Sequence, residues 1–265
     1  MSAPTAPASA SRSAIRALRN YAIRRRLVGL RILPSLAVAA IPCLVAAVAA
    51  TVGGKDAFEL YGEFIVPLTI YFVVPFVAMF SVLPLLGELY ENGAIGYLYT
   101  RPAPRWAPLL GIYLGAIISM IPVLIFAALA PGVILFVADS GTPLGDWLGR
   151  ILGLSGVLIL GGTAYGAVCM FFGVWSRRAI IWSVVVLIGW GVVFGGLPGA
   201  MRNTSPHRYL LGLAKDWCDV GNTWTGMFVP DPSPPGVMTS ILVLTGASIG
   251  FFLLAARAAT RRDVL

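Results

Sequence analysis

The sequence predicts an all-α integral membrane protein, and its composition and hydropathy lead to that fold class. The chain has 265 residues, of which 58% are hydrophobic and only 11% are charged, and its mean hydropathy is +0.87. A water-soluble domain carries about a quarter charged residues. This chain therefore has too few polar side chains to cover a surface that faces water, which excludes a cytosolic enzyme and a disordered protein.

Six apolar runs are long enough to cross a bilayer, since a spanning helix needs about 20 mostly apolar residues. They lie at about 33–52, 64–86, 108–136, 151–175, 179–197 and 237–256. The third run is long and contains Pro122 and Pro131, so we expect a kink, a tilt or an extension beyond the bilayer. The fourth and fifth runs are separated only by Ser176, Arg177 and Arg178, which predicts a tight turn.

The distribution of Arg and Lys predicts the orientation of these helices, because loops that stay in the cytoplasm collect positive charge. Of the 19 Arg and Lys residues, seven precede residue 33, two lie at 87–107, two at 176–178 and three follow residue 256. All of these fall on one side of a six-helix topology. The others fall on the opposite side and are Lys55, Arg150, Arg202, Arg208 and Lys215. Both termini are therefore expected in the cytoplasm, and the net charge of +8 needs no nucleic acid partner to explain it.

The N-terminal region divides into a tail and a basic segment. Residues 1–12 are rich in Ala, Pro and Ser and are expected to be disordered. Residues 13–31 repeat apolar side chains at helical spacing, which is typical of an amphipathic helix on the inner membrane surface. Its expected contacts with anionic lipid headgroups are Arg16, Arg19, Arg24, Arg25 and Arg26. An Arg-rich segment that only fixes topology is the alternative, and a signal peptide is rejected because the charged region is too long.

The cytoplasmic connection at 87–107 is the most informative segment of the sequence. Glu88 and Glu91 lie on one face of a helix that continues from the second run, and Gly93 allows a sharp change of direction. The connection ends with residues that turn the chain and return it to the membrane interface, Arg101, Pro102, Arg105 and Trp106. From physics alone, a docking segment for another protein and an ordinary interfacial loop are equal interpretations.

Together, several segments resemble the permease subunits of type-2 ATP-binding-cassette exporters. One is E-x-G, a short apolar stretch and T-R-P-x-x-R-W, which runs from Glu91 to Trp106. Another is the Ser-Arg-Arg turn before the fifth run, and a third is the Arg-Arg-Asp-aliphatic end of the chain. The basic N-terminal helix resembles the elbow helix of the same family. The segment from Glu88 to Gly93 is less charged than in many members of the family.

The resemblance implies a multi-pass permease in a bacterial cytoplasmic (inner) membrane, moving a substrate outward. Two copies of a separate P-loop ATPase would bind ATP and Mg²⁺, and a second permease, identical or paralogous, would complete the transporter. The residues that the resemblance implies in coupling to the ATPase are Glu88, Glu91, Gly93, Arg101, Pro102, Arg105, Ser176, Arg177 and Arg178. The expected partners of the chain itself are these subunits and membrane lipid.

The sequence contains no motif for catalysis or for a cofactor. It has no G-x-x-x-x-G-K-[ST] motif to hold ATP phosphates, and its single histidine, His207, is expected to be solvated outside the membrane. The three cysteines, Cys43, Cys169 and Cys218, have no metal-ligand spacing. We therefore expect no enzyme activity, metal or cofactor in this chain. The six runs also lack Lys, Arg, Asp and Glu in their interiors, which favours a permease powered by another subunit.

The external segment at 198–236 contains several aromatic side chains and is expected to form one or two short helices on the outer surface. Trp217 and Trp224 would then lie at headgroup level. A gate, a docking site for an extracytoplasmic partner and simple interfacial anchoring all remain open. The alternative to a transporter is a non-transporting membrane subunit that anchors an extracytoplasmic complex through this segment.

Small and aromatic residues within the runs carry further expectations. The glycines of the fourth run predict close helix–helix packing. Tyr71 and Tyr165 place hydroxyl groups within the membrane, where either a hydrogen-bond partner or a cargo path would explain them.

Overall fold

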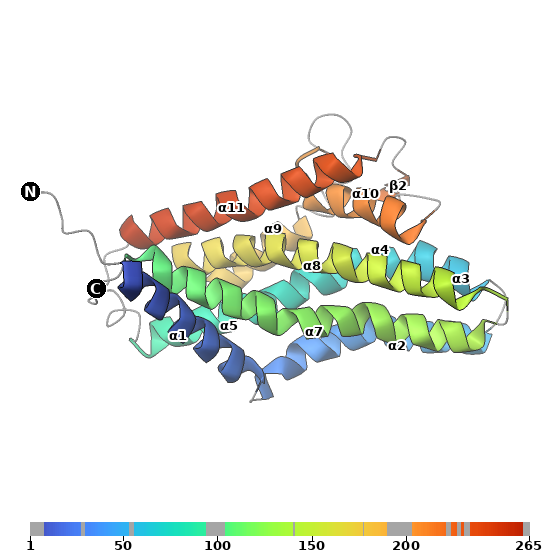
Figure 1. Cartoon of the computed structure of the whole chain (residues 1–265), viewed down its shortest axis with the longest axis horizontal. Coiled ribbons are helices and arrows are strands. Elements are labelled where there is room, and N and C mark those ends of the chain that lie inside the picture. Colours follow the sequence, from blue (N-terminus) through green and yellow to red (C-terminus); the bar gives the residue numbers. More distant parts are fainter. Residues whose placement is uncertain are drawn as a thin grey trace, which may run out of the picture.

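The computed structural model of the chain is a bundle of long helices (Figure 1). The structure describes residues 8–27, 30–52, 56–93, 104–139, 141–176, 178–189, 203–220, 224–226, 229–230 and 234–261. Helices make up nearly all of this part of the chain. The all-α class predicted from the composition is confirmed.

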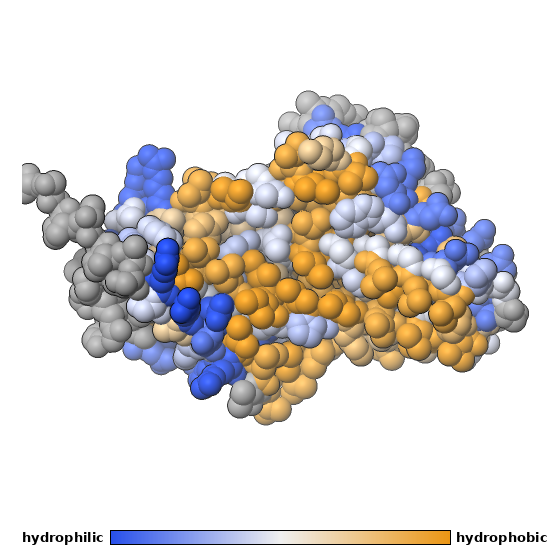
Figure 2. Space-filling model, viewed as in Figure 1, coloured by the Kyte–Doolittle hydropathy of each residue, from blue (hydrophilic) through white to orange (hydrophobic). Residues whose placement is uncertain are grey.

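Within the described residues, five helices are long and apolar enough to cross a membrane. They are Leu30–Thr51, Ala57–Glu91, Trp106–Ala138, Leu144–Trp175 and Val237–Arg261. On the face of the molecule in Figure 2, apolar side chains cover much of the middle, and hydrophilic side chains gather toward the two ends. This is the distribution of a multi-pass membrane protein, whose middle faces lipid and whose ends face water.

The N-terminal helix, α1 (Ala8–Leu27), begins within the tail that the sequence predicts to be disordered. A 3₁₀ turn, η1 (Leu30–Ile32), leads into the first spanning helix, α2 (Leu33–Val52). The bounds of α2 coincide with the first predicted run.

The second spanning helix is longer than the predicted run at 64–86, and its first half is irregular. Pro67 and Pro75 each lie at the start of a regular segment that follows a π-helical one. Proline has no N–H to donate to the carbonyl group four residues back, which gives the wider helical turns a local cause. In order, the segments are α3 (Ala57–Leu60), η2 (Tyr61–Ile65), α4 (Val66–Leu68), η3 (Thr69–Val73) and α5 (Val74–Glu91).

The next three helices are α7 (Trp106–Ala138), α8 (Leu144–Trp175) and α9 (Ala179–Gly189). α7 is one helix of 33 residues, about 50 Å long, and so extends beyond a bilayer core of about 30 Å. Only three residues separate the end of α8 from the start of α9, which confirms the tight turn predicted there. α9 covers only the first part of the fifth predicted run, and residues 190–202 lie outside the described residues. A sixth crossing therefore stays a prediction.

Arg150 lies on a spanning helix because α8 begins earlier than the predicted fourth run. Its side chain is 7% exposed. The NH1 group of Arg150 donates to the Phe58 carbonyl oxygen at 2.5 Å, and the NH2 group donates to the Asp219 carbonyl oxygen at 2.8 Å. The guanidinium carbon also lies 3.4 Å from the centroid of the Phe58 ring. The arginine expected in an external loop therefore joins α8 to two other segments.

The described helix of the segment that was expected outside the membrane packs against the bundle. This helix, α10 (Pro206–Cys218), lies against α8 and against the last helix, α11 (Val237–Arg261). Much of α10 is buried, including Leu210, Leu213 and Cys218. Two short antiparallel strands, β1 (Trp224–Gly226) and β2 (Val229–Pro230), follow it.

Trp217 of α10, which was expected at headgroup level on the outer surface, packs against α8. The indole ring lies over Gly156 of α8, and an added Cβ at Gly153 would be 2.1 Å from the Trp217 carbonyl oxygen. The two glycines leave room for α10 to approach α8, so packing against the bundle determines where this tryptophan lies.

α8 is the central helix of the bundle, since α5, α7, α10 and α11 all pack on it. The most apolar stretch of α8 is 78% buried, compared with 22% for α2 and 11% for α11. Glycine allows the close approach, because Gly161 faces Leu210 and Val74, and Gly162 faces Leu124. The predicted close packing of the glycine-rich fourth run is confirmed.

α1 is docked on α7 through two glycines with G-x-x-x-G spacing. An added Cβ at Gly111 would lie 2.7 Å from the α1 backbone, and one at Gly115 would lie 2.6 Å from the Ala22 Cβ and 2.7 Å from the Arg19 carbonyl oxygen. Leu18 and Ala22 are buried on this side of α1. The helix expected on the membrane surface therefore also packs tightly against the bundle.

Gly115→Ala should loosen α1, because the new methyl group meets backbone and Cβ atoms that cannot rotate away. Overpacking typically costs about 1–3 kcal/mol, so we expect a lower unfolding temperature in detergent and faster proteolysis at the arginines of α1. Gly149→Ala on α8 is the control, since nothing lies within 4 Å of its Cβ position. Equal behaviour of the two variants would contradict the close contact.

Candidate functional site

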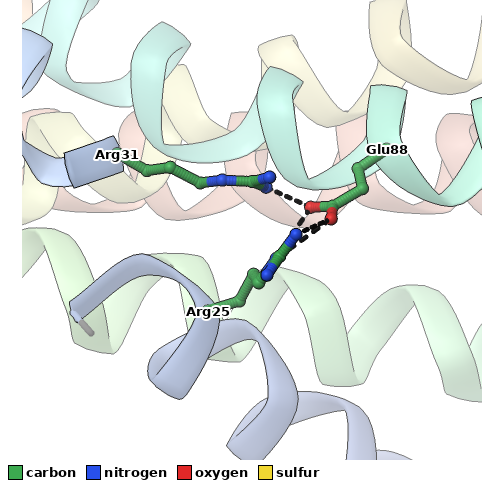
Figure 3. A network of polar contacts seen from close by, with 3 residues as sticks. All are labelled: Arg25, Arg31 and Glu88. Carbon is green, nitrogen blue, oxygen red and sulfur yellow. Dashed lines mark hydrogen bonds and ion pairs between the residues drawn. The ribbon is translucent and has the colours of Figure 1, made fainter. Parts of the chain in front are cut away.

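Three charged side chains meet where α1, η1 and α5 come together (Figure 3). We call Arg25, Arg31 and Glu88 the elbow cluster. The Nε and NH2 groups of Arg25 donate to Oε1 of Glu88 at 2.9 Å and 2.5 Å. Arg31 donates from NH1 to Oε2 of the same carboxylate. Both oxygens of Glu88 are thus engaged by residues of the same chain.

The elbow cluster joins the N-terminal segment to the end of the second spanning helix. The Glu88 side chain is 13% exposed, compared with 47% for Arg25 and 41% for Arg31. The hydrogen bond to Glu88 raises the pKa of the Arg25 guanidinium. A carboxylate shared by two arginines therefore holds three segments together.

This contact changes the roles expected for Glu88 and Arg25. From the sequence, Glu88 is expected to contact an ATPase and Arg25 to contact lipid headgroups, whereas the structure pairs the two side chains with each other. The residues are 63 positions apart. Opposite charges at such a separation form no periodic pattern, so only the tertiary structure reveals the pairing.

Arg26 is buried within the chain and does not face lipid headgroups as expected. Its side chain is 2% exposed because it continues the buried stripe of Leu18 and Ala22 along α1. NH2 donates to the Ser35 hydroxyl oxygen at 2.8 Å, while Nε and NH1 have no partner among the described residues. Burial lowers the pKa of the Arg26 guanidinium to about 10. The group therefore stays charged at neutral pH and places a buried cation beside the elbow cluster.

The remaining arginines of α1 keep positions suited to a membrane surface. Arg16 and Arg24 are exposed. Arg19 is half-buried and donates to the Asn20 side-chain oxygen at 3.0 Å. Their contact with lipid headgroups stays a prediction.

α5 ends in an exposed turn next to the elbow cluster. Glu91 is exposed, and among the described residues it has no hydrogen-bond or ion-pair partner. The Asn92 N–H donates to the Glu88 carbonyl oxygen at 3.0 Å at the helix end. Gly93 follows with a φ of 65°, a left-handed conformation that glycine adopts without strain. The predicted change of direction at Gly93 is confirmed.

Arg105 and Ser176 make contacts within the chain. Arg105 donates from NH1 to the Thr260 carbonyl oxygen at 3.1 Å, which joins the start of α7 to the end of α11. The Ser176 hydroxyl accepts a hydrogen bond from the Arg178 backbone N–H at 3.1 Å in the turn between α8 and α9. The other expected site residues lie outside the described residues and are Arg101, Pro102 and Arg177.

These contacts gather at one end of the bundle, where α1, the end of α5, the start of α7 and the end of α11 lie together (Figure 1). The structure thus brings Glu88, Glu91, Gly93 and Arg105 to the same end of the molecule. A displacement of one of these helices can reach its neighbours through the ion pairs of the elbow cluster and through the hydrogen bond from Arg105.

A second polar cluster is buried inside the bundle, and sequence patterns did not reveal it. His207 is 1% exposed and is not solvated as expected. Its ring stacks on Tyr71 with 4.7 Å between centroids and 11° between planes, and Nδ1 lies 2.7 Å from the Tyr165 hydroxyl. The two tyrosines in apolar runs were the available signal, because a hydroxyl group inside a membrane needs a partner.

Neither cluster has the ligands of a metal site. Among the described residues, no group of three or more His, Cys, Asp or Glu side chains lies close enough to hold a metal ion. The cysteines, Cys43, Cys169 and Cys218, are free thiols. The charged groups of the elbow cluster contact one another between α1, η1 and α5.

No protein-family model matches the chain, and no curated protein sequence matches it significantly.

Reversing the charge of Glu88 should destabilise the junction of α1 and α5. Glu88→Arg places a third cation beside Arg25 and Arg31, so we expect the unfolding temperature in detergent to fall by several degrees. The double variant Arg25→Glu/Glu88→Arg restores one opposite pair and should recover part of that loss. Glu91→Arg makes the same chemical change at an exposed position that has no partner among the described residues, and it should leave the unfolding temperature unchanged. Failure of the double variant to recover stability would contradict the ion pair.

Tyr165→Phe should destabilise the bundle by removing the hydroxyl partner of His207. An unsatisfied buried polar group costs about 1–3 kcal/mol, and thermal unfolding in detergent measures that loss. Tyr209→Phe is the control, because its hydroxyl donates to the carbonyl oxygen of an exposed residue, Asn203, which can bond to water instead. Equal losses in the two variants would argue against a special role for the buried pair.

Proposed function

We propose that the chain is the permease subunit of an ATP-binding-cassette exporter in a bacterial cytoplasmic membrane. In this proposal it crosses the membrane six times, with both termini in the cytoplasm and α1 as the elbow helix. One observation carries the proposal. A basic helix that precedes the first spanning helix is docked on α7 and is ion-paired to Glu88 at the end of α5, where the connection at 87–107 begins.

The connection at 87–107 would act as the coupling segment, and both of its ends are attached to other helices. At the near end, the elbow cluster links α5 to α1 and η1. At the far end, Arg105 links the start of α7 to α11. A push on this segment by an ATPase would therefore reach several spanning helices at once.

Glu91 is the acidic contact that we propose for the ATPase, in place of Glu88. Glu88 is already engaged by two arginines of the same chain, whereas Glu91 is exposed at the end of α5. Gly93 would direct the segment away from the helix axis, and the turn at 176–178 would provide a second, smaller contact.

Two ATPase subunits and a second permease would complete the transporter. ATP and Mg²⁺ would be bound by the ATPase, because this sequence contains no P-loop motif. Much of α2 and α11 is left uncovered by the rest of the chain, which provides apolar surface for lipid and for another permease.

Glu91→Arg should weaken the association with a P-loop ATPase while the permease stays folded. We expect roughly tenfold less ATPase after affinity purification from native membranes in mild detergent, as the loss of one charged contact can produce. Mass spectrometry of the co-purified proteins measures the ratio.

Glu59→Arg is the matched control, since Glu59 is an exposed acidic residue at the opposite end of the same spanning segment. Unchanged ATPase recovery with Glu91→Arg would contradict the coupling assignment. Recovery of an extracytoplasmic protein and no ATPase with the wild type would favour the non-transporting anchor subunit.

A further inference from the structure

An apolar cavity of about 180 Å³ lies among α8, α9, α10 and α11. α9 and α11 both pack on α8 but make little contact with each other. The cavity therefore has α8 as its floor and α9 and α11 as its sides. The wall residues used below are Tyr165, Val168, Leu187, Leu244, Ala247 and Phe251.

The cavity lies at the depth of the hydrocarbon core. Tyr165 is ten residues before the end of α8 at Trp175, and Ala247 is ten residues after the start of α11 at Val237. At a rise of 1.5 Å per residue, each is about 15 Å from that end of its helix. That distance is half the thickness of a bilayer core of about 30 Å.

The tyrosine hydroxyls of the wall are already hydrogen-bonded to the protein. The Tyr165 hydroxyl lies 2.7 Å from Nδ1 of His207, and the Tyr209 hydroxyl donates to the Asn203 carbonyl oxygen at 2.7 Å. The wall residues from α9 and α11 are all Val, Leu, Ala or Phe, and the described lining includes no charged residue. A polar ligand would leave its own hydrogen-bonding groups unsatisfied here, whereas a hydrocarbon would not.

The cavity wall is continuous with the uncovered surface of α11. Val243 belongs to the wall and is 38% exposed, while Leu244, beside it in the chain, is 1% exposed. The neighbouring face of α11, which holds Leu242 and Ile249, is also apolar and exposed. In a bilayer this surface faces lipid tails, so the nearest molecules of matching chemistry are acyl chains.

We propose that this cavity binds the end of an acyl chain of a membrane phospholipid, inserted from the side between α9 and α11. An apolar cavity of about 150 Å³ stays dry and holds a benzene-sized molecule. A volume of about 180 Å³ therefore accepts the end of an acyl chain. It is too small for a drug-sized ligand, which needs about 300–1,000 Å³. The proposal requires only that the bundle spans a bilayer, so it stands apart from the proposed transport function.

The test uses the full-length chain in lipid nanodiscs that contain a phosphatidylcholine with a diazirine at the end of one acyl chain. Illumination attaches the lipid to side chains within its reach, and mass spectrometry locates the adducts. We expect adducts on Val168 and Leu244, which are 5% and 1% exposed and face the cavity. Lipid that only surrounds the protein would label outward-facing residues such as Leu242.

Ala247→Phe should fill the cavity and abolish most labelling of Val168 and Leu244, while the labelling of Leu242 stays unchanged. Ala47→Phe on the exposed side of α2 is the matched control. Ala164→Leu fills the same cavity from α8 and serves if Ala247→Phe does not fold.

Two results would overturn the proposal. One is wild-type protein without adducts on Val168 and Leu244, which would result if a second permease covered the cavity. The other is unchanged labelling of these residues in the folded cavity-filling variants.

Discussion

Close backbone packing at small residues determines how these helices are arranged, because lipid tails compete with apolar side chains for the helix surfaces. An added Cβ would collide with a neighbouring segment at Gly115 of α7 and at Gly153 of α8. The first position lets α1 lie against α7, and the second lets α10 lie against α8. α8 is thereby surrounded by other helices, while α2 and α11 keep large uncovered surfaces.

Two polar side chains inside the bundle, Arg150 and His207, have partners within the chain, as a medium without water favours. Arg150 donates to two backbone carbonyl groups, and His207 is paired with Tyr165. At one end of the bundle, Glu88 is shared by two arginines. Each of these contacts joins segments that are far apart in the sequence, so they determine the register of the bundle as well as satisfying the polar groups.

The two ends of α5 have different physical characters. The segment before it has π-helical turns beside prolines, while its far end is charged and ion-paired to the N-terminal segment. If the connection at 87–107 receives force from an ATPase, the ion pair at the charged end passes that force to α1. The π-helical segments at the other end are where the backbone hydrogen bonding of this spanning helix departs from the regular α-helical pattern.

The sequence by itself determined the class of the protein, the positions of most spanning helices, the turn at Ser176 and the change of direction at Gly93. These features depend on local hydropathy and on the conformational freedom of single residues, which neighbouring residues reveal. The tertiary structure decided the pairing of Glu88 with Arg25, the burial of Arg26 and His207, and the packing of Trp217 against α8. Those outcomes depend on which helices approach one another closely. The composition of a single apolar run does not specify which other helices will pack against it.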